Sequence, residues 1–122
     1  MTLDGYNRFC GGLSHAVHVI QWGGAHVWKI GPKVFAIAGW GEGEELAVTF
    51  KCSPASFDLL KQLGGLRPAP YLASRGMLWI QRTDKSSMDD AALKDYVRES
   101  YRLVSLNLTK KMQRELGLNG VT

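Results

Sequence analysis

The sequence has little cysteine and no long hydrophobic run. Cys10 and Cys52 are its two cysteines in 122 residues, and two distant thiols do not form the disulfide framework of a small secreted domain. The longest mostly apolar stretch, residues 34–40, is far too short to cross a bilayer. The first five residues lack the basic and apolar segments of a secretory signal. We therefore expect a cytoplasmic protein that makes no use of a membrane.

Motifs for metal binding or catalysis are also missing. His15-x-x-His18 with His26 could surround zinc, but positions 15 and 18 of a strand point to opposite faces. Cys10 or Cys52 with a histidine would make a minimal dyad, yet no third group orients it. We expect structural or surface histidines, buried free thiols, no cofactor and no enzymatic activity, since an enzyme would need a deep pocket with converging ionisable groups.

The amino-acid composition of the chain is typical of one globular domain. Hydrophobic residues make up 45% of the chain and charged residues 21%, close to the averages for folded proteins. Because no repeat or linker divides the chain, a single domain over residues 1–122 is expected. The net charge of +4 and the isoelectric point near 9.2 permit a polyanionic partner, although they serve solubility equally well.

The N-terminal half of the chain predicts a helix followed by an antiparallel meander. The turn residues Gly31-Pro32 match a type II′ hairpin, because glycine tolerates a positive φ and proline supplies φ near −65°. In that register Trp28 faces Phe35, His26 faces Ile37, and Trp28, Phe35 and Ile37 share one face. The elements expected are a helix from residue 3 ended by Gly11-Gly12, an edge strand over 15–22, and strands over 26–30, 33–37 and 46–51.

The C-terminal half alternates helices with one more strand. Ser53-Pro54 starts a helix ended by Gly64-Gly65. After an irregular segment over 66–76 and a strand over 77–82, Ser87 with Asp90 resembles a capping box for a long helix to residue 108. Thr109 caps a further turn or two.

The order of elements predicts an α+β fold: an antiparallel sheet of four to five strands with an N-terminal helix, a middle helix and a long C-terminal helix packed on it. The expected core is apolar and comes from both halves of the chain: Trp28, Phe35, Ile37, Leu46, Val48, Phe50, Phe57, Leu60, Leu93, Val97, Tyr101 and Val104.

Several of these segments together resemble the MmcQ/YjbR family over nearly the whole chain. The run Lys-Ile-Gly-Pro-Lys-Val-Phe-Ala at 29–36 precedes the Ser53-Pro54 helix start. Leu-Arg-Pro-Ala-Pro-Tyr-Leu at 66–72, with Trp79 shortly after, is the most specific piece. The helix over 96–108 followed by Lys110-Lys111 matches the C-terminal part.

The resemblance implies a small bacterial α+β protein, usually labelled DNA-binding. It also implies a fold similar to that of type III secretion chaperones and a "double wing" likeness to some transcription-factor domains. The label is an analogy at the level of the fold. Because the sequence shows no helix-turn-helix pair, we expect any DNA binding to use phosphate contacts with little sequence specificity.

Two groups of basic residues are candidates for that contact. The first group lies in or beside the irregular segment: Arg67, Tyr71, Arg75, Arg82 and Lys85. Arginine forks bind phosphates and aromatic rings stack on bases, but the same loop could instead be rigid and packed, with Arg67 paired to a carboxylate such as Asp58. The second group is Lys110, Lys111 and Arg114, which could equally be a solvated face.

The alternative function is that of a protein-interaction or chaperone-like adaptor without DNA binding. Its mark would be a contiguous exposed apolar patch, for which Trp22, Trp40 and Val34 are the candidates. Under either hypothesis we expect a monomer.

Overall fold

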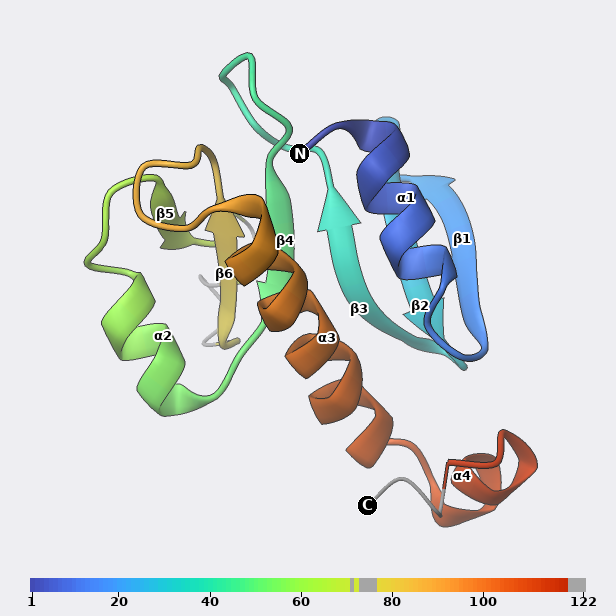
Figure 1. Ribbon diagram of the computed structural model, residues 1–122. Helices are drawn as coiled ribbons and strands as arrows, with labels where there is room; N and C mark the ends of the chain where they lie inside the picture. The colour runs from blue at the N-terminus through green and yellow to red at the C-terminus, as the bar shows by residue number, and fades with distance from the viewer. Residues whose placement is uncertain (71, 73–76, 119–122) are drawn as a thin grey trace.

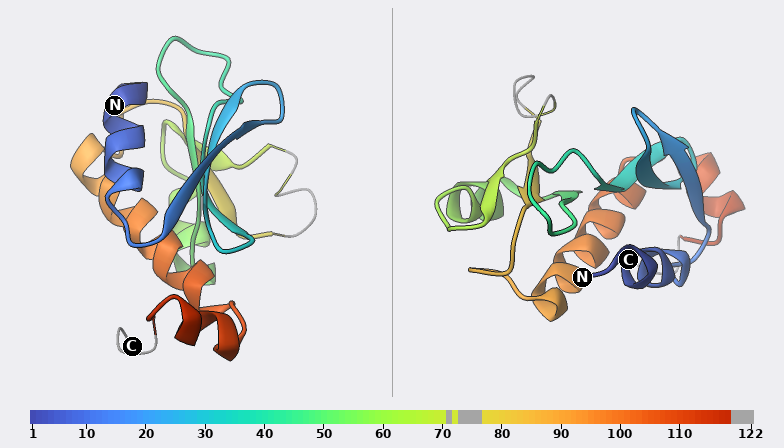
Figure 2. Two further views of the ribbon diagram at one scale, coloured as in Figure 1. Left: turned by 90° about the vertical axis from the view of Figure 1, so that its right-hand side faces the viewer. Right: turned by 90° about the horizontal axis from the view of Figure 1, so that it is seen from above.

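Helices cover one face of a six-stranded antiparallel sheet (Figures 1 and 2). The computed structural model describes residues 1–70, 72 and 77–118. Within them the helices are α1 (Leu3–Gly11), α2 (Pro54–Leu60), α3 (Asp90–Leu106) and α4 (Lys110–Glu115). The strands are β1 (Ala16–Gln21), β2 (Ala25–Ile30), β3 (Lys33–Ala38), β4 (Val48–Lys51), β5 (Leu66–Pro68) and β6 (Trp79–Arg82). The predicted α+β class is confirmed, with one strand more than expected.

The extra strand is β5, which pairs with β6 at the edge of the sheet in the order β1-β2-β3-β4-β6-β5. Its segment was expected to be irregular. Three residues are too few to show an alternating pattern, and Pro68 cannot donate a hydrogen bond to a neighbouring strand. An edge position tolerates that proline, because one side of an edge strand needs no partner.

The β2–β3 hairpin has the predicted turn but a different register. Gly31 takes φ 56°, and Ile30 faces Lys33 across the two-residue turn. A bulge between Trp28 and Lys29 then shifts the pairing by one residue, so that Trp28 faces Ala36 and His26 faces Ala38. The predicted pairs of Trp28 with Phe35 and of His26 with Ile37 are therefore wrong, because a bulge sets two residues against one.

The bulge also decides which side chains enter the main core between sheet and helices. Trp28 and Phe35 still share that core, together with Ala36. Ile37, expected beside them, lies on the opposite face with Ala25 and Val27. The rest of the predicted core is confirmed: Val48, Phe50, Leu60, Leu93, Val97 and Val104 are buried, and Leu46, Phe57 and Tyr101 pack against them partly buried.

Helix ends follow local capping chemistry, with two corrections. Ser53 caps α2 through its side chain, as predicted, but α2 ends at Leu60 rather than at Gly64-Gly65. The N-cap of α3 is Asp89, whose side chain accepts a hydrogen bond from the Ala92 amide at 2.8 Å. Ser87 is not the cap, because Asp89 lies three residues before Ala92 and so reaches its amide.

The sheet consists of two half-sheets, β1-β2-β3 and β4-β6-β5, that separate at one end. Strands β3 and β4 pair over Ala36–Ala38 and Val48–Phe50 and then diverge. The buried hydroxyl of Ser100, on α3, fills this gap: it accepts from the Lys51 amide at 2.9 Å and donates to the Phe35 carbonyl at 2.7 Å. A helix side chain thus satisfies two buried backbone groups where the ladder is interrupted. No helix within the described ranges is long and apolar enough to span a bilayer.

Candidate nucleic-acid interface

The short helix α4 is held against the β2–β3 turn and the end of α3. Thr109 caps α4 as predicted, with its Oγ1 accepting from the Met112 amide at 3.1 Å. A Cβ on Gly31 would lie 2.8 Å from the Sδ of Met112, so glycine lets the turn and the helix approach closely. The Gln113 Nε2 donates to the carbonyls of Ser105, at 3.1 Å, and Leu108, also at 3.1 Å, and these bonds satisfy carbonyls that the end of α3 leaves free.

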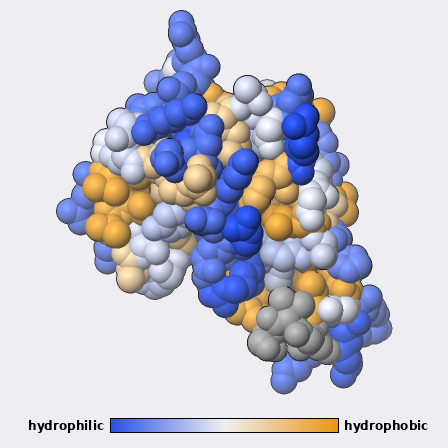
Figure 3. Space-filling model, viewed as in Figure 1, coloured by the Kyte–Doolittle hydropathy of each residue, from blue (hydrophilic) through white to orange (hydrophobic). Residues whose placement is uncertain are grey.

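This anchoring gathers four exposed cations at one end of the molecule: Lys33, Lys110, Lys111 and Arg114, here named the basic end. Lys33 follows the turn that contacts Met112, and the other three lie on α4. None of the four makes an ion pair with any described residue. In the space-filling view, hydrophilic residues form the outer rim of this end at the lower right of Figure 3, with apolar residues beside them. The basic end is therefore a surface whose four cations are free of ion pairs within the described part of the chain.

A hollow of about 260 Å³ adjoins the basic end at the gap between the half-sheets. Lys33 and Lys51 line it from the two half-sheets, and Asn107, the C-cap of α3, also lines it. The Trp79 side chain contributes to the wall. The hollow thus adds a fifth cation, Lys51, to the neighbourhood of the basic end.

The other predicted group of basic residues is used inside the protein. Arg67 is partly buried, and its Nε donates to the Gln81 Oε1 at 2.7 Å. Asp58, named as an example of a carboxylate partner, pairs instead with Lys61 at 3.1 Å, so that example is wrong. Arg67 also borders a hollow that carries four carboxylates: Glu42, Glu44, Glu45 and Asp84. Those carboxylates disfavour the approach of a phosphate to Arg67.

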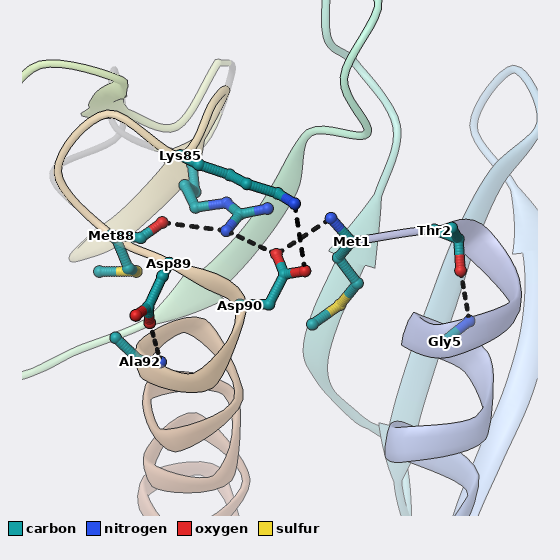
Figure 4. A network of polar contacts seen from close by, with 9 residues as sticks. Met1, Thr2, Gly5, Lys85, Met88, Asp89, Asp90 and Ala92 are labelled. Atoms are coloured by element: carbon teal, nitrogen blue, oxygen red, sulfur yellow. Dashed lines mark hydrogen bonds and ion pairs between the residues drawn. The ribbon is translucent and has the colours of Figure 1, made fainter.

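Arg82 is fully buried and contacts Met88 and Asp90, which Figure 4 labels at the start of α3. Its Nη1 donates to the Met88 carbonyl at 3.0 Å and to the Asp90 carboxylate at 3.1 Å. Its Nε and Nη2 have no hydrogen-bond partner among the described residues. A guanidinium with no exposed surface cannot reach a phosphate, so the structure removes Arg82 from the candidate interface.

The Asp90 carboxylate is the centre of a network that also includes Lys85. The Lys85 Nζ lies 3.5 Å from Asp90 Oδ2, and the Met1 amine lies 3.0 Å from Oδ1. Burial opposes ionisation of Asp90, but hydrogen bonds from the Met1 amine and Arg82 outweigh it and lower the pKa of the carboxyl to about 2. Lys85 is exposed, but its charge is shared with this carboxylate.

The two predicted groups therefore do not form one surface. The β6–α3 loop with Lys85 and helix α4 lie at opposite ends of the fold in both Figure 1 and Figure 2. Tyr71 and Arg75, the remaining predicted contacts, lie outside the described residues. Sequence reasoning missed Lys33 and Lys51, because the approach of the β2–β3 turn to α4 and the lining of the hollow depend on tertiary packing rather than on local spacing.

The cysteines lie in the core rather than in a reactive site. Both thiols are free and buried, as predicted. Burial raises the pKa of Cys10 to about 12 and that of Cys52 to about 11, so both stay protonated at neutral pH. Within the described part of the chain, no three histidine, cysteine or carboxylate side chains form a group that could hold a metal.

Exposed apolar side chains lie on the edge strand β1 and just beyond it. Val17, Ile20 and Trp22 are 54%, 59% and 52% exposed. Trp40 and Val34, the other candidates for an apolar patch, are partly buried against the small cluster on the outer face of the sheet. Trp22 contacts Trp40 with ring centroids 5.7 Å apart. The outer end of the first half-sheet is therefore more apolar than the basic end.

The fold is one that solved structures share. A crystal structure of the Deinococcus radiodurans protein DR2400, described with the domain DUF419, superimposes with a TM-score of 0.82 at 25% identity, covering 96% of this chain and 88% of that one. A Pseudomonas syringae protein superimposes with a TM-score of 0.68 at 14% identity over 85% of this chain and 99% of its own, which concerns the fold alone. No curated protein sequence matches the chain.

These likenesses define a class of small α+β proteins with helices on one face of an antiparallel sheet. The YjbR family model matches residues 11–103. The chain therefore belongs to the YjbR family, which confirms the resemblance seen in the sequence.

Proposed function

We propose that this protein binds nucleic acid through the phosphate backbone, at the basic end, without acting as an enzyme. The observation that carries the proposal is the gathering of Lys33, Lys110, Lys111 and Arg114 with no ion-pair partner among the described residues. Unpaired surface cations attract a polyanion, and the release of condensed counterions then drives binding. The family's usual label points to the same partner.

The shape of the basic end favours contacts to phosphates over base contacts. Helix α4 has six residues, so it is about 9 Å long and cannot present several side chains along a major groove. Lysine is a flexible point charge that suits phosphates of any sequence. We therefore expect little preference for sequence, and a strong dependence on salt.

Fluorescence anisotropy with a random-sequence duplex tests the proposal. Engaging four phosphates predicts a slope of log K against log salt of about −3 to −4 for the wild type. The triple variant Lys110→Ala, Lys111→Ala, Arg114→Ala should reduce the slope to about −1, the share of one remaining cation.

A matched control removes the same charge elsewhere. Arg98 and Arg102 each pair with a carboxylate on α3, and Lys61, the C-cap of α2, pairs with a carboxylate on α2. Replacing these three cations by alanine also lowers the net charge by three. This control should keep a slope near that of the wild type. Equal losses in both triple variants would show that net charge, rather than the basic end, governs binding. Absence of wild-type binding at low salt would eliminate the proposed function.

A second candidate is a protein-interaction module that uses the edge strand β1. It is favoured by the exposure of Val17, Ile20 and Trp22, since apolar side chains on an unpaired edge can accept a further strand. Trp22→Ser should leave the salt slope unchanged if nucleic acid is the partner. If a protein partner is found, the same variant should weaken its binding while the α4 triple variant does not.

A further inference from the structure

The hollow between the two half-sheets has a mainly apolar wall and room for one small group. Val34 and Ile37 of β3, Trp79 of β6 and Val104 of α3 line it. Its volume is about 260 Å³, whereas pockets that hold a drug-sized ligand start at about 300 Å³. The hollow can therefore take a single ring or a single side chain, but not a large ligand as a whole.

Positive charge lies beside this apolar wall. Lys33 and Lys51 also line the hollow, and neither pairs with a carboxylate among the described residues. None of the described residues that line the hollow is an aspartate or a glutamate. The Ser100 Oγ accepts a hydrogen bond from the Lys51 amide at 2.9 Å, which fixes the backbone from which the Lys51 side chain extends. An occupant that suits the hollow therefore joins a negative charge to an apolar or aromatic body.

An exposed indole and an amide complete the lining. Trp22 is 52% exposed, and its ring contacts that of Trp40 with centroids 5.7 Å apart. An indole held in this way at the surface is a platform on which a nucleobase stacks. Asn107, exposed at the C-cap of α3, has a side-chain amide that both donates and accepts hydrogen bonds. These two groups match the flat face and the polar edge of a base, which an aliphatic anion lacks.

We propose that the hollow binds an unpaired base of single-stranded nucleic acid, with the phosphates beside that base on Lys33 and Lys51. This inference rests on the proposed function and adds the form of nucleic acid that the site prefers. Lys33 belongs to the basic end as well as to the hollow, so a strand that leaves the hollow meets the cations of α4. Cations along the backbone and aromatic rings for the bases are the usual means of holding a single strand. A base within a duplex must first be unstacked and unpaired, so single strands should bind more tightly than duplex.

Two fluorescein-labelled strands with the same phosphates test this site by anisotropy. One is an oligothymidylate of about eight nucleotides, within the site sizes of single-strand binding domains, and the other is an abasic strand of the same length. Stacking of one base predicts that the wild type binds the oligothymidylate at least about fivefold more tightly at a fixed salt concentration. Trp22→Ala should remove most of this difference and leave the salt slope unchanged, because stacking releases no counterions.

Ile20→Ala is the matched control. Ile20 lies two positions before Trp22 and is 59% exposed, but it does not line the hollow, so this variant should keep the preference for the oligothymidylate. Equal affinity of the wild type for the two strands would overturn the base site and leave phosphate binding at the basic end in place. A preference that survives in Trp22→Ala would also overturn it. If neither strand binds at low salt, the proposed function fails together with this inference.

Discussion

Arg82 and Lys110 both carry a positive charge, but the protein surrounds them in opposite ways. Arg82 has no exposed surface and donates to Asp90 and Met88. Lys110 is exposed at the start of α4 and has no ion-pair partner among the described residues. A charge that is already paired stabilises the fold or is tolerated by it, whereas an unpaired surface charge is available to a ligand. Basic residues near β6 should therefore affect stability, and those of α4 should affect binding.

Removing the partner of the buried guanidinium should have the largest effect. Asp90→Ala leaves Arg82 charged and uncompensated in the interior, so we expect the free energy of unfolding to fall by about 3 kcal/mol. Urea denaturation measures this loss. Asp95→Ala is the control, because Asp95 makes an exposed pair with Arg98 on the same helix and should change stability by less than about 0.5 kcal/mol. Similar losses in the two variants would contradict the structural role assigned to Arg82.

Replacing Arg67 should lower the free energy of unfolding without changing the salt slope of duplex binding. Arg67→Ala removes the hydrogen bond to the Oε1 of the fully buried Gln81 and should cost about 1.5 kcal/mol, mainly by leaving that buried oxygen unsatisfied. The salt slope of duplex binding should stay at the wild-type value, because the carboxylates around Arg67 keep phosphates away. A slope reduced by about one would place Arg67 in the interface after all.

The Asp90 network should also make the free energy of unfolding depend on pH in the acid range. The pKa of Asp90 is about 2 in the folded protein and about 3.9 in an unfolded chain. Because the folded value is the lower one, the stabilisation is complete above about pH 4 and is lost as the pH falls toward 2. With solvent screening of this partly exposed group, the loss attributable to Asp90 should be about 1 kcal/mol. Denaturation at pH 5 and at pH 2 should therefore show a larger drop for the wild type than for Asp90→Asn, and equal drops would exclude this network as the cause.

The smallest effect on stability should come from the basic end. Lys110→Ala should change the free energy of unfolding by less than about 0.5 kcal/mol, as for other exposed substitutions. It should still reduce the salt slope of duplex binding by about one, because one phosphate contact is lost. Anisotropy and urea denaturation on the same preparation measure both values. A destabilised Lys110→Ala variant would mean that the lysine has a structural partner.

Local chemistry in the sequence predicted most elements and several of their ends. Ser53 and Thr109 were predicted as caps, and both hydroxyls accept the expected backbone hydrogen bonds. The Gly31-Pro32 turn, the family and the α+β class were likewise accessible, because caps, turns and periodicity depend on residues a few positions apart.

The tertiary structure alone decided which basic residues are free. Arg67 finds Gln81, fourteen positions away, and Arg82 finds Asp90 across a loop, and no local pattern distinguishes these arginines from solvated ones. The bulge beside Trp28 in the β2–β3 pair moved Ile37 to the other face of the sheet. Such outcomes depend on how distant segments pack, so the sequence by itself determined the elements and the fold class, and packing determined the site.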